Sequence, residues 1–147
     1  MNTPANITRL VFELIGSDEE VRVLSFSGSE SISGLFSFSL DVACENGTMT
    51  ADSFLSKSGL LTLVDPSTHR LLHGEIIDAA QVNQGRRFTQ FQLTVAPKPW
   101  YLLSRSGSQI FQEQSIPAII KTVLGDAGIR GSDVRFSLTS SYSPRTY

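Results

Sequence analysis

Two histidines are the side chains best suited to chemistry in this chain of 147 residues. His69 and His73 lie in the segment THRLLHGE, with Glu75 close behind. On a helix, two histidines four residues apart share a face and can hold a zinc ion. This segment is instead rich in aliphatic residues and follows turn residues, which favours a strand. Because the chain has no third histidine and its one cysteine, Cys44, is distant in sequence, we expect no metal and no cofactor.

A hydrolytic site is the second chemistry that the residue types allow. Serine catalysis needs a histidine that is oriented by an acid and reaches the serine. The segment GSESISG lacks the Gly-x-Ser-x-Gly spacing of a nucleophile elbow. The segment GDAGIRGS lacks the lysine of a phosphate-binding loop and follows a helical pattern instead of a strand. The sequence therefore favours a protein that is not an enzyme, and a hydrolase is the third of three hypotheses.

Arg86 and Arg87 lie beside a predicted hairpin tip at Asn83-Gln84-Gly85. Two arginines are too few to form a nucleic-acid footprint. The net charge of −2 and the pI of 5.6 give no reason to expect nucleic acid or an anionic membrane as a partner. We therefore interpret the pair either as solvated side chains or as a contact with a protein partner.

The elements that carry these residues are expected to be mostly strands. Six segments combine alternation or branched aliphatic content with bordering turn residues. They are TRLVFEL, VRVLSFSG, FSFSLDVA, LLTLVD, RLLHGEIIDAAQV and RFTQFQLTVAP. In the third segment Phe38, Leu40 and Val42 alternate with smaller residues, so the large side chains share one face. Six strands at short spacing predict an antiparallel barrel or sandwich.

One segment after the strands has a helical period. Its apolar residues follow one stripe, at Ile116, Ile119, Ile120, Val123, Leu124 and Ala127. Ser115 is a good N-cap, Pro117 suits the first turn, and Gly128 can end the helix in a left-handed conformation. The segment DVRFSLTSSYSPRTY is then expected to begin another strand.

Length and composition set further limits. The length suits one domain, or one domain and part of another, and the apolar share of 40% can form a core. A single cysteine cannot pair within the chain, which indicates a reducing compartment. The first twenty residues lack the regions of a Sec signal, and no apolar run approaches the roughly 18 residues of a membrane span. We expect cytoplasmic synthesis without membrane insertion.

Three blocks, in order, resemble VgrG, the spike protein family of type VI secretion. FSGSESIS at 26–33 fits F-x-G-x-E-x-[LI]-S, and RLLHGEI at 70–76 fits R-x-[FLW]-H-G-x-[VI]. SQIFQEQSIPAII at 108–120 fits S-x-I-F-Q-x-x-[ST]-[VI]-P-x-I-I at every fixed position. The resemblance covers essentially the whole chain, and its last block is specific.

The resemblance implies a mainly β fold with one clear α-helix. An antiparallel β-barrel of the phage tail-hub type is expected over residues 1–105, followed over 106–147 by a helix and the incomplete start of a second lobe. The implied role is a structural hub segment that trimerises into a pseudo-sixfold ring. That ring docks on the Hcp tube and carries the rest of the spike with effector or adaptor proteins. Export is expected through the type VI apparatus to the cell exterior or a target cell.

Two surfaces are the candidate partner contacts. In the family the chain continues into a second lobe, so the stripe of the predicted helix is expected to be incompletely covered. An uncovered apolar stripe is either a liability or an oligomer contact. The candidate interface residues are Arg86, Arg87, Ile116, Ile119 and Val123.

A stand-alone β-barrel that binds a glycan or a peptide is the alternative hypothesis. It would use Trp100, Tyr101 and nearby phenylalanines, and it predicts an exposed aromatic cleft. A role for Trp100 as a lid over the core is the simpler interpretation.

Overall fold

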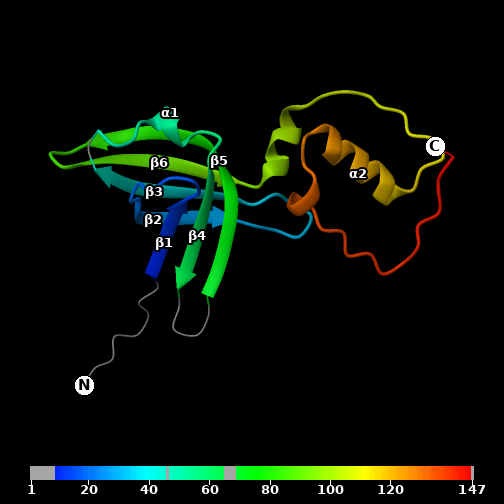
Figure 1. The fold of residues 1–147 in the computed structure, drawn as a ribbon, viewed down its shortest axis with the longest axis horizontal. Coiled ribbons are helices and arrows are strands. Elements are labelled where there is room, and N and C mark those ends of the chain that lie inside the picture. Colours follow the sequence, from blue (N-terminus) through cyan, green and yellow to red (C-terminus); the bar gives the residue numbers. More distant parts are fainter. Residues whose placement is uncertain (1–8, 46, 65–68, 147) are drawn as a thin grey trace, which may run out of the picture. The chain divides into compact units, whose positions relative to one another are not determined.

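The chain forms two compact units, Met1–Pro97 and Lys98–Tyr147. A computed structural model describes residues 9–45, 47–64 and 69–146. Among the described residues the first unit holds six strands and the short helix α1, and the second holds helix α2 and two 3₁₀ turns (Figure 1). Each unit is described by itself, and the assignment of 106–147 as part of a second lobe stays a prediction.

The first unit is one antiparallel sheet in the strand order β1-β4-β5-β6-β3-β2. The strands are β1 (Arg9–Leu14), β2 (Arg22–Ser29), β3 (Ser37–Glu45), β4 (Ser58–Val64), β5 (His69–Gln84) and β6 (Phe88–Ala96). Each predicted segment forms one of these strands. The sheet curls into a half-barrel with β1 and β2 at its two edges (Figure 1). The predicted mainly β, antiparallel fold is therefore confirmed.

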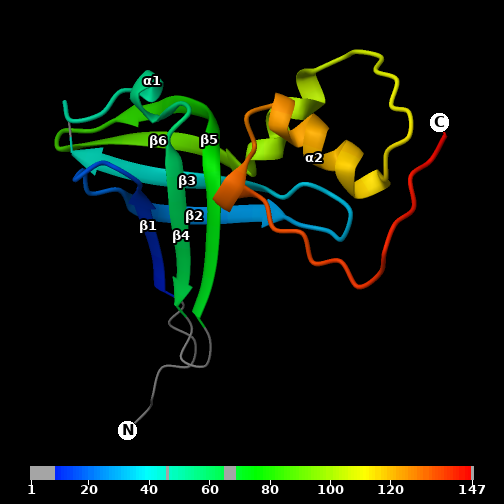
Figure 2. The ribbon, with the colours of Figure 1, turned by 45° about the vertical axis from the view of Figure 1, so that its right-hand side comes forward.

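β5 is the strand that bends the sheet. Its 16 residues pair first with β4 and then with β6, and Glu75 belongs to both ladders. Register shifts between Ile76 and Asp78 and between Gln81 and Asn83 mark irregularities of the bulge type, which increase local twist. In Figure 2, β1 and β4 consequently run across the direction of β2 and β3.

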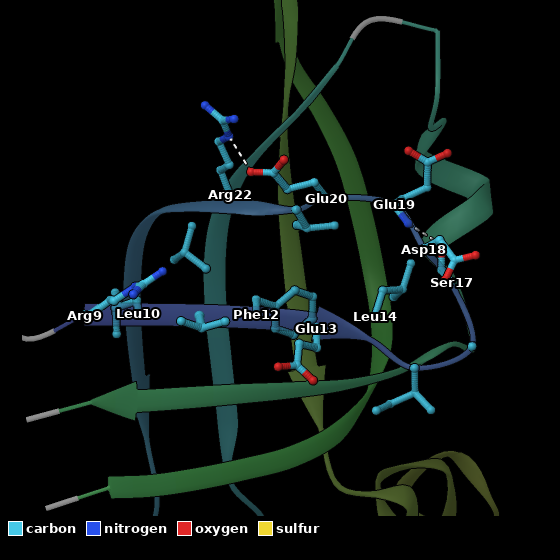
Figure 3. A pocket seen from close by; sticks show the side chains of 15 residues that line it. Arg9, Leu10, Phe12, Glu13, Leu14, Ser17, Asp18, Glu19, Glu20 and Arg22 are labelled. Carbon is cyan, nitrogen blue, oxygen red and sulfur yellow. Dashed lines mark hydrogen bonds and ion pairs between the residues drawn. The ribbon is translucent and has the colours of Figure 1, made fainter.

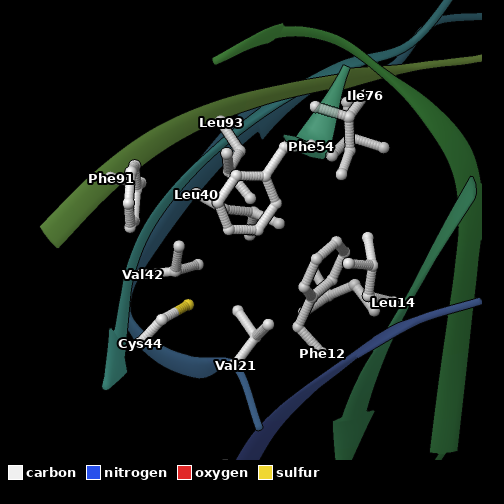
Figure 4. Close-up of a cluster of buried hydrophobic side chains, with 12 residues drawn as sticks. Phe12, Leu14, Val21, Leu40, Val42, Cys44, Phe54, Ile76, Phe91 and Leu93 are labelled. Carbon is white, nitrogen blue, oxygen red and sulfur yellow. The ribbon is translucent and has the colours of Figure 1, made fainter. Parts of the chain in front are cut away.

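The inner face of the half-barrel holds one apolar core (Figure 4). Its buried members are Phe12, Leu14, Val21, Leu40, Val42, Cys44, Phe54, Leu61, Ile76, Phe91, Leu93 and Val95. The predicted alternation on β3 and β6 is thus confirmed. The helix α1 (Ala51–Phe54) begins at Thr50 with a capping box. It places the Phe54 ring 5.1 Å from the ring of Phe91.

The second unit is built on helix α2 (Ile116–Asp126), between the 3₁₀ helices η1 (Lys98–Ser104) and η2 (Gly131–Asp133). Ser115 is the N-cap, as predicted, but its hydroxyl makes no capping hydrogen bond. Gly128 has φ +79° and ends the helix, as predicted. Gly128 N–H donates to Gly125 O at 3.0 Å and Ile129 N–H to Leu124 O at 2.9 Å, which is a Schellman motif.

The strand expected after this helix is not formed by residues 134–146. The segment has one isolated antiparallel bridge, in which Arg145 N–H donates to Gln114 O at 3.0 Å. Alternation of Val134, Phe136 and Leu138 would suit a strand, but a strand also needs a neighbour for its backbone groups. No such neighbour lies among the described residues of the second unit.

Candidate functional site

Both histidines lie on the outer face of β5. His69 pairs with Val64 and His73 with Leu60 across the β4–β5 ladder, and both imidazoles are exposed. In the described part of the chain, no three His, Cys, Asp or Glu side chains come close enough to hold a metal ion. These histidines occupy an ordinary strand.

Gly74, which follows His73, has a structural role. It lies directly opposite Gly59 on β4. A Cβ at Gly74 would come within 2.7 Å of Val95 Cγ1 and 2.8 Å of Ala96 O, while a Cβ at Gly59 would meet the Phe12 ring at 2.3 Å. Close strand packing therefore explains the glycine of the RLLHGEI block.

A pocket of about 710 Å³ lies between the two edge strands of the half-barrel (Figure 3). It is lined by residues 9–23, and no ladder joins β1 to β2 in this range. Phe12, Leu14 and Val21 are buried along it, whereas its rim is charged. Glu20 pairs with Arg22 at 2.9 Å. The lining contains no histidine and no cysteine, and this seam leaves the edges of β1 and β2 without a shared ladder.

The predicted arginine pair lies at the tip of the β5–β6 hairpin, where Gly85 N–H donates to Phe88 O at 2.9 Å. The Arg87 guanidinium carbon is 5.3 Å from the centroid of the Phe88 ring, and the guanidinium carbon of Arg22 is 5.4 Å from the same centroid. Glu45 pairs with Arg87 at 3.5 Å. The side chains of Arg22 and Arg87 are mostly exposed, so these contacts orient the two guanidinium groups without burying their charge.

Arg22 is the member of this cluster that sequence reasoning missed. It lies 65 positions before Arg87 in the sequence. The two residues come together because β2 and β6 both pair with β3 in the sheet. Single-sequence patterns carry no signal for that pairing.

The predicted interface stripe lies on α2. Ile116, Ile120 and Val123 are exposed by 40%, 44% and 36%, and Ile119 and Leu124 are half-buried. No residue of α2 is fully buried. Exposed apolar side chains on consecutive turns leave an uncovered helix face. Whether this face or the arginine pair binds a partner stays a prediction.

The aromatic residues of the alternative hypothesis lie in η1. Trp100 is half-buried and Tyr101 is exposed. Four pockets among the described residues each have one phenylalanine in their lining, namely Phe12, Phe36, Phe111 or Phe136. Neither Trp100 nor Tyr101 lines any of these four pockets. The expected aromatic cleft therefore has no support in these four pockets.

Known proteins similar to this chain give its family. A family model described as the phage tail baseplate hub matches residues 29–147. The chain belongs to this hub family. The hub chain is also 32% identical to the type VI secretion system spike protein VgrG4b of Pseudomonas aeruginosa, over 100% of its own length and 18% of that protein. VgrG5 of the same organism is 34% identical, again over 100% of the hub chain and 18% of the relative. The resemblance to VgrG is confirmed.

A solved structure supports the fold. It is that of the E. coli c3393 protein, described as a component of the type VI secretion system with structural similarity to T4 bacteriophage tail proteins gp27 and gp5. The match has a TM-score of 0.78 and 24% identity, and it covers 92% of the hub chain and 37% of that chain. This match supports the fold, and the family match with the spike relatives makes the hub chain a type VI spike or phage tail hub-like protein.

The hub chain spans about a fifth of the length of these spike relatives. Among the described residues, no helix has the length and apolar character needed to cross a membrane.

Proposed function

We propose that the chain is a structural N-terminal hub segment of a type VI secretion spike and acts without catalysis. The observation that carries this proposal is its end-to-end similarity to spike proteins at 32–34% identity. The hub-family match agrees with a structural role.

In this proposal three copies form a pseudo-sixfold ring that docks on the Hcp tube during contractile delivery. The ring also carries the rest of the spike and its effector or adaptor proteins. The chain is made in the cytoplasm and leaves the cell through the type VI apparatus. Arg86 and Arg87 supply a protein contact, and the exposed side chains of Ile116 and Val123, with Ile119, supply another.

The test combines the purified chain with purified Hcp hexamers. Size-exclusion chromatography with light scattering is expected to give the mass of a trimer, and the trimer is expected to co-elute with Hcp. A strict monomer with no co-elution at high concentration contradicts assembly by this segment.

Charge reversal tests the hairpin tip in the same assay. The double variant Arg86→Glu, Arg87→Glu is expected to weaken Hcp binding by roughly tenfold, because the proposal requires acidic groups of Hcp opposite the tip and these would then be repelled. Arg135→Glu is the matched control, since Arg135 is exposed and lies in the second unit. Equal binding by the two variants rules out the tip as the contact.

A further inference from the structure

A fully exposed isoleucine lies at the tip of the turn between β2 and β3. Gly34 N–H donates to Ser31 O at 3.3 Å, which places Ile32 and Ser33 at the centre of the turn. Ile32 is 99% exposed. Ser33 has φ +65°, in the left-handed region that costs a residue with a Cβ about 1–2 kcal/mol. A strained turn that presents a large apolar side chain to water indicates a role beyond connecting two strands.

Both ends of this turn are held by the sheet. Glu30 forms an ion pair with Arg70 on β5. At the other end the Phe36 ring stacks on Phe38, with centroids 5.0 Å apart and planes 21° apart. Because its base is fixed, Ile32 is presented as a preorganised knob, which lowers the entropy cost of inserting it into a partner.

The second unit contains an apolar pocket of about 480 Å³ that is left open beside α2. Its lining includes Leu124, Ile129, Val134 and Phe136, with Lys121 and Arg130 as the basic members. Arg130 Nε–H donates to Gly125 O at 2.8 Å, and a guanidinium has four further N–H donors. The pocket therefore suits an aliphatic side chain that has a carboxylate beside it.

We propose that the Ile32 turn of one copy inserts into this α2 pocket of a second copy. Ile32 would fill the apolar lining, and the second oxygen of Glu30 would face Lys121 and Arg130. The knob belongs to the first unit and the pocket to the second. A contact that joins the knob of one copy to the pocket of another is therefore heterologous, and heterologous contacts close rings when their rotation permits. This inference rests on the proposed function, because it names the contact that closes the trimer.

Mixing two variants that each carry one new cysteine, both in a Cys44→Ala background, tests the contact directly. Ile32→Cys and Lys121→Cys, carried by separate copies of different tag length, should form a disulfide-linked heterodimer under mild oxidation. The control pair is Ile32→Cys with Ile110→Cys, since Ile110 is 84% exposed and lies outside the pocket lining. The expected rate is at least about tenfold above this control, because binding places the two thiols at high effective concentration. Equal rates overturn the proposal.

Replacing Ile32 by a small polar residue tests how much its side chain contributes to self-association. Ile32→Ser should raise the dissociation constant for self-association about 10- to 100-fold, as expected for losing a buried isoleucine contact. Leu71→Ser is the matched control, because Leu71 is also exposed on the first unit, and it should leave self-association unchanged. An unchanged constant in Ile32→Ser overturns the proposal.

The two proposals fail in different ways. If the wild-type chain trimerises and binds Hcp while Ile32→Ser does so equally well, this contact is wrong and the proposed function stands. If the heterodimer forms and Ile32→Ser weakens assembly, but Hcp does not co-elute, the contact stands and the docking proposal is wrong.

Discussion

Gly74 lies where two ladders of the half-barrel meet, next to the residue that pairs with both β4 and β6. A methyl group there would come within 2.8 Å of a backbone oxygen, Ala96 O, which cannot move aside as a flexible side chain can. Close strand packing at this point therefore depends on the absence of a side chain.

Gly74→Ala is accordingly expected to lower the free energy of unfolding by roughly 1–3 kcal/mol, the usual cost of overpacking. Gly107→Ala is the control, because a Cβ at Gly107 has no atom within 4 Å. Urea unfolding followed by circular dichroism measures both variants. Equal stability of the two variants would contradict the packing argument.

Cys44 gives a pH-dependent prediction. Burial, with the charge of Glu19 as a smaller cause, raises the pKa of the Cys44 thiol from 9.0 to about 11. The unfolded thiol ionises first as pH rises, so the thiol's contribution to stability is complete below pH 9 and is lost as pH approaches 11. Between pH 8 and 11 the urea midpoint should therefore fall more steeply for the native chain than for Cys44→Ala. Parallel curves would show that the thiol does not take part.

At the scale of elements, the end of α2 has a well-defined stop. Gly128 adopts the left-handed conformation at the Schellman motif. Gly125 lies inside the helix, where a Cβ would have only an ordinary van der Waals contact with Arg130 Nε at 3.6 Å. The two glycines therefore respond to alanine in opposite directions.

Gly128→Ala should destabilise the helix by about 1 kcal/mol, because alanine pays the left-handed penalty. Gly125→Ala should stabilise it by roughly 0.5–1 kcal/mol, because alanine has the higher helix propensity. Thermal melts followed at 222 nm give the sign of each change. A loss of stability in Gly125→Ala would mean that its Cβ disturbs Arg130, 3.6 Å away.

The sequence predicted the elements whose information is local. Alternation located the strands, and the apolar period with Gly128 located α2. It did not predict how the sheet curls, because curvature depends on the register shifts of β5 and on the paired glycines, Gly59 and Gly74. The candidate arginine pair was visible, but its neighbour Arg22 and the strained Ile32 turn arise from tertiary geometry. The prediction of a strand after α2 was wrong, because an alternating sequence does not form a strand without a neighbouring strand to pair with.

At the scale of the whole molecule, the two units differ in how well they are packed. The first unit has a continuous core, whereas α2 contains no fully buried residue. Local stability follows buried apolar contacts, so the second unit should open at lower free energy.

Hydrogen exchange measures this difference. Amides of α2 are expected to exchange at least about tenfold faster than the central amides of β3 and β6. Addition of a partner that covers the α2 stripe should slow the α2 amides and leave the sheet amides unchanged. Equal protection of α2 and the central strands in the free chain would contradict this view of the second unit.

β5 has a consequence for cooperativity. One continuous strand is hydrogen-bonded to β4 along one part and to β6 along the other, with Glu75 common to both ladders. Neither side of the half-barrel can separate from the other without breaking part of this strand's backbone pairing. The sheet is therefore expected to behave as a single foldon, so that a strong pull on one edge strand is transmitted through β5 to the opposite edge. If the proposed role in contractile delivery holds, this coupling lets the hub segment carry a mechanical load as one body.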